Sequence, residues 1–145
     1  MKTHIGDGLI YNKILIGIDE SEESKKAVKR VIEIQKDFGG DTVVFHSVLH
    51  GFASRESIKE EDMKEGKKIL SNVEKIFKDV NLSIETRLIE DVHPEDFIKE
   101  VVEKEKFNLV VLGNKGKHKL LRRSVIGSIP ANVMNSVLCD VLVIR

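Results

Sequence analysis

The sequence predicts an α/β protein in which one open five-stranded parallel sheet lies between two layers of helices, a three-layer α/β/α arrangement. Five short apolar runs typical of buried strands alternate with four longer amphipathic segments typical of helices. This alternation favours right-handed crossovers, which place successive strands parallel in one sheet. With 145 residues, 41% of them hydrophobic, the chain can bury one substantial core. We therefore expect a single domain over residues 11–145, preceded by an N-terminal tail over residues 1–10.

The first two strand–helix units fill the first half of the chain. Residues 13–18 form an apolar run bounded by polar residues, which predicts a buried strand. The helix that follows has Ser21 as its N-cap and ends at Gly39-Gly40. Residues 42–49 predict the second strand, and a long charged helix starts near Glu56. The apolar stripe of this helix is expected in the core: Ile69, Leu70, Val73, Ile76, Phe77 and Val80.

The second half begins with a strand whose two faces differ. Between residues 83 and 89 apolar and charged side chains alternate, with Glu85 and Arg87 on one face, which predicts an edge strand or one with a solvated face. Pro94 opens the next helix. Residues 109–112 are continuously apolar, as expected of a central parallel strand. The last elements are a helix from near Ser128 and a strand over residues 141–144. Met134 and the phenylalanines are expected in the core.

Composition narrows the partners and the cellular location. The 24 basic and 24 acidic residues cancel, so no overall charge attracts the chain to nucleic acid or to an anionic membrane. Cys139 is the only cysteine, which excludes an intramolecular disulfide and favours a reducing compartment. No apolar run approaches the roughly 20 residues of a membrane helix, and the N-terminus lacks the apolar core of a secretory signal. A cytoplasmic protein is expected.

Candidate ligand contacts gather in the loops after the first and fourth predicted strands, where open parallel sheets bind ligands. Asp19 ends the first of these strands. The second loop lies in a stretch from Lys106 to Cys139 that contains no Asp or Glu. That stretch carries six basic residues and attracts anions locally: Lys106, Lys115, Lys117, Lys119, Arg122 and Arg123.

Glycines at both ends of the second loop suit phosphate groups. Gly113 and Gly116 leave the fourth strand, and Gly127 with Ser128 enters the last helix. Glycines let backbone N–H groups approach phosphate oxygens, a serine adds a hydroxyl, and a helix N-terminus adds its dipole. Each feature alone is an ordinary turn or cap. Together with the missing acids they favour phosphate binding.

Several stretches of the sequence resemble the universal stress protein family, and they cover nearly the whole chain after the tail. They are KILIGIDES from residue 13, VFHSV from residue 44, LGNKG from residue 112, Gly127-Ser128, and CDVLVI from residue 139. Nucleotide-binding members carry two glycines three apart, nine further residues, and then Gly followed by Ser or Thr. Here residues 117–126 number ten, so the phosphate loop is expected to bulge or shift. Val92 also stands where the family often has glycine.

The resemblance is to the ATP-binding branch of the family. It implies the Rossmann-like fold of adenine nucleotide alpha hydrolases, strand order 3-2-1-4-5, and ATP with Mg²⁺ or Mn²⁺ bridging the phosphates. By position it implies that Asp19 and the backbone around Ser47 hold the adenosine, with Leu112 lining it. The residues that it places against the phosphates are Gly113, Gly116, Gly127, Ser128 and Ile129.

The predicted function is an ATP-binding stress-response or signalling module, and no catalytic base is evident. The sequence contains no Ser/His/Asp set, no paired carboxylates beside the glycine loop and no complete P-loop. Two alternatives stay open: a slow ATPase or phosphotransferase that uses Asp19 and Mg²⁺, and a nucleotide-free interaction protein. His46 and His50 are four residues apart on a strand and its loop, a spacing that puts no shared helical face toward a metal and favours structural roles.

A homodimer is expected through the last strand. In the order 3-2-1-4-5, the third and fifth strands are the two sheet edges. Charges protect the third, whereas residues 141–144 (Val141-Leu142-Val143-Ile144) are apolar on both faces, and such edges tend to pair with another chain. Two copies could meet through their last strands, antiparallel about a twofold axis, so that each copy covers the exposed edge of the other.

Overall fold

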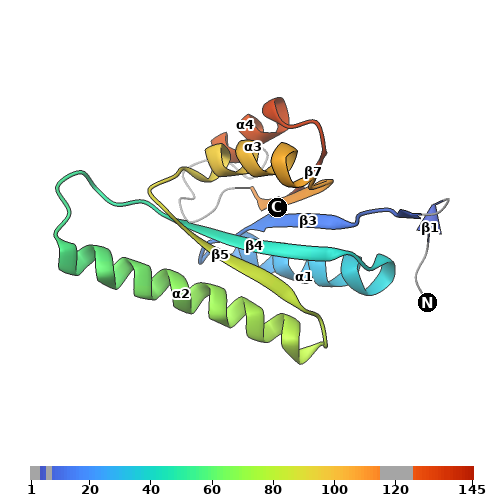
Figure 1. Ribbon diagram of the computed structural model, residues 1–145, viewed down its shortest axis with the longest axis horizontal. Helices are drawn as coiled ribbons and strands as arrows, with labels where there is room; N and C mark the ends of the chain where they lie inside the picture. The colour runs from blue at the N-terminus through green and yellow to red at the C-terminus, as the bar shows by residue number, and fades with distance from the viewer. Residues whose placement is uncertain (1–3, 6–7, 115–125) are drawn as a thin grey trace.

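The computed structural model of the 145-residue chain describes residues 4–5, 8–114 and 126–145. Five parallel strands form one sheet in the order β5-β4-β3-β6-β7 (Figure 1). Counted along the chain after the N-terminal strand pair, this is the order 3-2-1-4-5, so the predicted fold class is confirmed. The strands are β3 (Lys13–Gly17), β4 (Asp41–Val48), β5 (Ile84–Glu90), β6 (Leu109–Gly113) and β7 (Asp140–Ile144).

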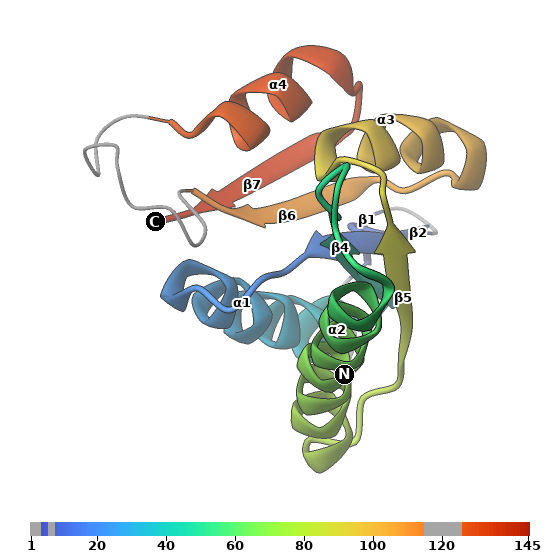
Figure 2. The ribbon, with the colours of Figure 1, turned by 90° about the vertical axis from the view of Figure 1, so that its left-hand side faces the viewer.

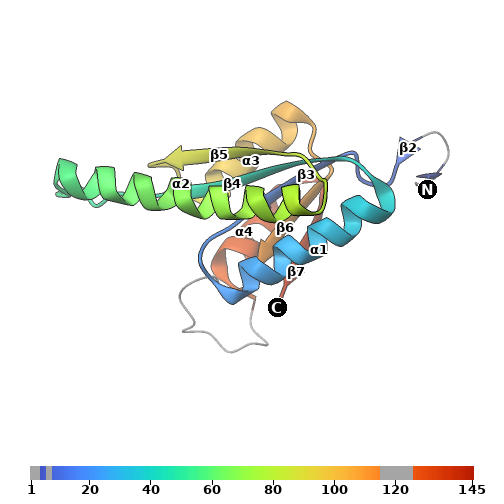
Figure 3. The same cartoon turned by 90° about the horizontal axis from the view of Figure 1, so that it is seen from below.

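Two pairs of helices cover the two faces of the sheet (Figure 2). One face carries α1 (Glu22–Phe38) and α2 (Glu56–Asp79), which lie toward the viewer in Figure 3. The other face carries α3 (Pro94–Glu105) and α4 (Ser128–Ser136). Because successive strand residues point to opposite faces, β3 serves both cores. Ile14 and Ile16 pack in the cluster with α1 and α2, and Leu15 packs in the cluster with α3 and α4.

A short antiparallel pair precedes the sheet, although the sequence predicts no structure there. It consists of β1 (His4–Ile5) and β2 (Gly8–Leu9). The pair lies near the start of β3, at the end of the sheet where the parallel strands begin (Figure 1). It is therefore remote from the carboxyl ends of the strands, where the candidate site residues lie.

Three side chains that were expected in the core are exposed. Ile76 on α2 is 47% exposed, Met134 on α4 is 51% exposed, and Phe52, in the loop before α2, is fully exposed. The buried stripe of α2 is narrower than predicted and consists of Gly66, Leu70, Val73 and Phe77. Because α2 packs on β4 and β5, at one side of the sheet, its outer apolar positions reach past the core.

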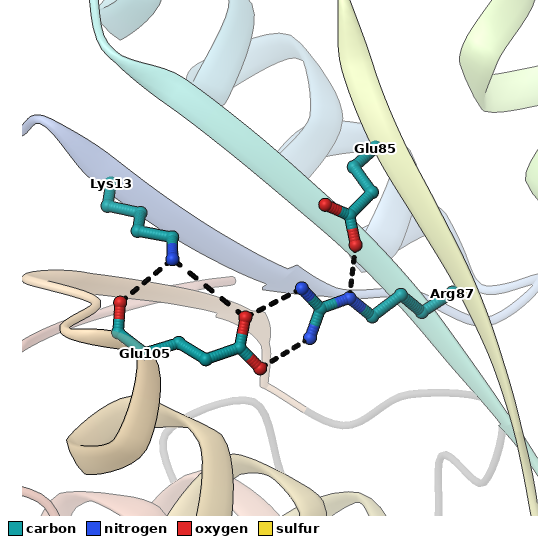
Figure 4. A network of polar contacts seen from close by, with 4 residues as sticks. All are labelled: Lys13, Glu85, Arg87 and Glu105. Carbon is teal, nitrogen blue, oxygen red and sulfur yellow. Dashed lines mark hydrogen bonds and ion pairs between the residues drawn. The ribbon is translucent and has the colours of Figure 1, made fainter.

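An ion-pair network joins the β5 edge to the end of α3 (Figure 4). Two nitrogens of the Arg87 guanidinium donate to the Glu105 carboxylate, each at 2.7 Å, and Arg87 also contacts Glu85. Lys13 at the start of β3 donates to the Glu105 carbonyl oxygen at 2.8 Å. Hydrogen bonds from Arg87 hold the pKa of Glu105 below its ordinary value. β5 is an edge strand, which confirms one of the two predicted alternatives, and the end of α3 partly covers its charged face.

Candidate functional site

A cavity of about 900 Å³ opens at the carboxyl ends of the strands, within the usual range for small-molecule sites. The chain runs from β3 to β4 on one side and returns to β6 on the other, so the cavity lies where the winding direction of the sheet reverses. Seven of the eight predicted site residues line this cavity: Asp19, Ser47, Leu112, Gly113, Gly127, Ser128 and Ile129. The eighth, Gly116, lies outside the described residues.

Asp19 is anchored by the start of α1. Its Oδ1 atom accepts hydrogen bonds from the Ser21 backbone N–H and the Ser24 hydroxyl, both at 2.8 Å. The Asp19 backbone N–H donates to the Ser24 hydroxyl at 2.9 Å. Ser21, as predicted, is the N-cap of α1, and its hydroxyl accepts from the Ser24 backbone N–H. Asp19 thus belongs to the helix start as well as to the cavity wall, and its orientation is fixed.

The floor of the cavity is apolar. Leu112 on β6 is 5% exposed and Phe45 on β4 is 1% exposed, and both line the cavity. Gly17 at the end of β3 makes room for them, since a Cβ atom there would lie 2.9 Å from the Phe45 ring and 3.1 Å from Leu112. This apolar part of the wall suits a planar ring system.

A buried hydroxyl on β4 adds a polar group to the cavity. Ser47 lines the cavity, and its Oγ atom is buried with no hydrogen-bond partner in the described part of the chain. A buried polar atom that stays unsatisfied is costly, so such atoms in native proteins usually meet a partner. A polar group of a bound ligand would supply that partner.

Two glycines are required where the cavity meets the ends of the predicted phosphate loop. A Cβ atom on Gly113 would lie 2.8 Å from Glu23 Cβ on α1. A Cβ atom on Gly127 would lie 2.2 Å from the Asn114 carbonyl oxygen. In both cases the close neighbour belongs to the protein itself, so these glycines are needed for packing whether or not a phosphate binds.

Asn114 fastens the two ends of that loop together. Its side chain is 3% exposed, and its Oδ1 accepts a hydrogen bond from the Gly127 backbone N–H at 3.0 Å. The Asn114 backbone N–H donates to the Ile144 carbonyl oxygen at 2.8 Å. The segment that was expected to bulge lies mostly outside the described residues. Sequence analysis assigned no role to Asn114 and missed this bond, which spans 13 residues.

Gly127 is also the N-cap of α4, and as a glycine it makes no side-chain cap hydrogen bond. The first backbone N–H groups of a helix have no partner within the helix, and they carry the positive end of its dipole. Ser128, the first residue of α4, is exposed at this end. The start of α4 therefore offers backbone donors and a hydroxyl to an anion in the cavity.

The described wall of the cavity carries five carboxylates: Asp19, Glu20, Asp62, Glu65 and Glu95. Five of the six predicted cations lie outside the described residues. The sixth, Lys106, is the C-cap of α3 and does not line the cavity, so its assignment to the anion site was wrong. Two of these carboxylates come from α2, which sequence analysis did not connect with the site. Gly66 allows α2 to approach the sheet, since a Cβ atom there would lie 2.7 Å from Leu88 and 2.9 Å from Val48. A lone glycine inside a charged helical stretch was the available signal.

The sequence profile of the Universal stress protein family matches residues 10–145, which is almost the whole chain. The chain belongs to this family. Universal stress protein MJ0531 of Methanocaldococcus jannaschii is 34% identical over 143 residues, covering 94% of this chain and 83% of that protein. The resemblance noted in the sequence is thereby confirmed.

Solved structures of universal stress proteins have the same fold. One in complex with cAMP is 28% identical, with a TM-score of 0.70 and with 93% of this chain and 97% of that chain covered. The protein from Archaeoglobus fulgidus in complex with dAMP is 22% identical, with a TM-score of 0.71 and coverage of 94% and 100%. Among the described residues, no helix has the length and apolar character needed to cross a membrane.

Proposed function

We propose that the cavity binds ATP and that the chain acts as a nucleotide-dependent stress-response or signalling module in the cytoplasm. The observation that carries this proposal is that predicted residues from β3, β4, β6 and α4 converge on one cavity. Related universal stress proteins solved in complex with cAMP or dAMP support an adenine nucleotide as the class of ligand. The cytoplasmic location rests on the lone Cys139, which suits a reducing compartment.

The adenosine and the phosphates would occupy different parts of the cavity. The apolar floor at Leu112 suits the adenine ring, the Ser47 hydroxyl gains a partner, and the anchored Asp19 carboxylate accepts a hydrogen bond from the ribose. The phosphates would lie against Gly113, Gly127 and Ser128, which line the cavity where α4 begins.

The residues present fit a divalent cation beside the phosphates. The described wall carries carboxylates, and a carboxylate facing a phosphate is repelled unless a cation lies between them. Asp19 is the group that would hold hydrated Mg²⁺ or Mn²⁺ there. The cation supplies charge neutralisation and bridges the phosphate oxygens.

A binding module is proposed over an ATPase because the sequence contains no Ser/His/Asp set and no complete P-loop. His46 and His93 line the cavity, and the His46 Nδ1 lies 2.7 Å from the Ile18 carbonyl oxygen, which can only accept, so Nδ1 carries the proton and cannot act as a base. Asp19 accepts two hydrogen bonds from α1. Slow hydrolysis and a nucleotide-free interaction protein are the alternatives to be tested.

Calorimetric titration with ATP, ADP, AMP and GTP, followed by product analysis after incubation with Mg²⁺, separates these functions. The proposal expects saturable binding of ATP, weaker binding of GTP and intact ATP after incubation. Accumulation of ADP would assign a phosphate-releasing enzyme instead. If no adenine nucleotide binds, the remaining alternative is a nucleotide-free interaction protein.

The homodimer through β7 is proposed on the character of that edge. Val141, Leu142 and Val143 are half-buried in the monomer, and Leu138, just before the strand, is fully exposed. The Ile144 carbonyl bonds back to Asn114, beyond the end of β6, so by alternation the backbone groups of Val143 point away from the sheet. These outward groups and the apolar side chains beside them are available to a second copy.

A further inference from the structure

His50 is enclosed by carboxylates outside the cavity just described. It lies two residues beyond β4, and its side chain is 2% exposed. Its Nε2 lies 2.9 Å from Glu90 Oε2, and its Nδ1 lies 3.8 Å from Asp62 Oδ2. Asp91 Oδ1 accepts a hydrogen bond from the His50 backbone N–H at 3.0 Å. One potential ligand atom from each of His50, Glu90 and Asp91 lies within 4.8 Å of the others.

The imidazole in this cluster lacks a complete set of partners. The partners described for its two ring nitrogens are carboxylate oxygens, which accept hydrogen bonds and do not donate them. A neutral imidazole has an N–H on one ring nitrogen and a lone pair on the other. With carboxylates beside both nitrogens, the lone pair must face a carboxylate, which is unfavourable. Nδ1 is buried and makes no hydrogen bond within the described chain, since 3.8 Å is too long for one. A positive centre is what such a cluster requires.

We propose that His50, Glu90 and Asp91 bind a divalent transition-metal cation of the zinc type. Nε2 and one oxygen of each carboxylate are the ligands, a mixture of imidazole and carboxylate that Zn²⁺ accepts. Zn–N and Zn–O bonds of about 2.0–2.2 Å place tetrahedral ligand atoms about 3.4 Å apart. The described separations, from 2.9 Å to at most 4.8 Å, span that value. With Nε2 on the metal, Nδ1 carries the proton and Asp62 orients the ring.

The sheet topology brings these residues together. β4 and β5 pair in parallel as far as Val48 and Glu90, so both strands end at the same edge. The Asp91 backbone N–H donates to the Val48 carbonyl oxygen at 2.9 Å, which holds the two following loops side by side. Asp62 comes from α2 and lines the nucleotide cavity, whereas the three proposed ligands do not. The metal site is therefore separate from any cation bound to nucleotide phosphates.

The test is a titration of the nucleotide-free, full-length chain with Zn²⁺ in competition with a chromophoric chelator. We expect one tight Zn²⁺ per chain, and X-ray absorption at the zinc edge that shows one nitrogen ligand among oxygens. His50→Gln and Asp91→Asn are each expected to weaken Zn²⁺ binding by at least about tenfold. Asp91→Asn retains the acceptor for the His50 N–H, and asparagine tolerates the left-handed conformation of that residue, whose φ is 58°.

Two control variants separate this site from incidental zinc binding. His93→Gln removes an exposed histidine whose Nδ1 lies 3.7 Å from Glu95, and it should leave the affinity unchanged. Cys139→Ser should do the same, since burial raises the pKa of that thiol and disfavours the thiolate that binds metals. Circular dichroism of the metal-free variants reports whether they fold. If His50→Gln is unfolded, the Zn²⁺ affinities of Glu90→Gln and Asp91→Asn test the site. No tight binding to wild type, or equal binding to the ligand variants, overturns the proposal.

Discussion

Replacing Asn114 with alanine is expected to weaken both the fold and the nucleotide site. The change removes the Oδ1 atom that accepts the Gly127 N–H at 3.0 Å, in a place where the side chain is 3% exposed. Gly127 is buried as well, so the access of solvent to its unpaired N–H is restricted. The donor is the N-cap residue of α4, so the start of that helix and the end of β6 lose their direct side-chain link.

The size of the effect follows from the burial of the donor. A buried N–H that loses its acceptor costs about 1–3 kcal/mol. A domain of this length changes Tm by about 2–4 °C for each kcal/mol, so the expected drop is about 2–12 °C. If the same free energy is needed to hold the loop for ATP, the affinity falls by about 5- to 150-fold, because about 1.4 kcal/mol is a factor of ten.

Differential scanning calorimetry and ATP titration of the same preparation measure the two effects. Asn135→Ala is the matched control, because Asn135 is exposed on α4, and its Tm should stay close to that of wild type. Valine at Gly127 is a poorer probe, since its Cβ would lie 2.2 Å from the Asn114 carbonyl oxygen and disturb the same contact sterically. An Asn114→Ala protein with wild-type Tm and wild-type ATP affinity would refute this reasoning.

Three further predictions follow from the structure. Asp19→Asn keeps an oxygen for Ser21 and Ser24 but removes the charge, so ATP–Mg²⁺ affinity should fall about tenfold with little change in Tm; unchanged affinity in calorimetry would restrict Asp19 to the helix start. Val143→Pro removes an outward donor of β7 and should give monomers in analytical ultracentrifugation, whereas a wild type already monomeric at micromolar concentration excludes the dimer. Because Arg87 holds the pKa of Glu105 down, the stability from this pair is complete above about pH 4.3 and is lost in more acidic solution. The Tm advantage of wild type over Glu105→Gln should thus vanish on acidification, and its persistence at about pH 2 would contradict the assignment.

The sheet could be predicted because its signals are local. Residues 109–112 are continuously apolar and therefore buried on both faces, and the four intervening amphipathic segments dictate crossovers. The limits of the helix stripes could not be predicted in the same way. Ile76 has the helical spacing of a core residue, yet it is exposed because α2 covers only one side of the sheet. The exposure of Ile76 depends on which elements lie beside α2, and the spacing of apolar residues along the helix does not show this.

The site was predictable where chemistry and position coincide along the chain. Gly113 and Gly127 flank a stretch without acids, and Asp19 ends a strand, so each carries its own signal. Asn114 carries no such signal, since its partner lies 13 residues away across the loop. His50 depends even more on topology, because its partner Glu90 is 40 residues away and meets it only through the pairing of β4 with β5.

A crystal structure of the chain grown with ATP and Mg²⁺ tests the proposed nucleotide site most directly. We expect the adenosine between Asp19, Ser47 and Leu112, and the phosphates at the start of α4 against Gly127 and Ser128, with the Ser47 hydroxyl hydrogen-bonded to the ligand or to a water that it orders. ATP bound elsewhere on the molecule, or a cavity that contains solvent alone at saturating ATP, would contradict the account.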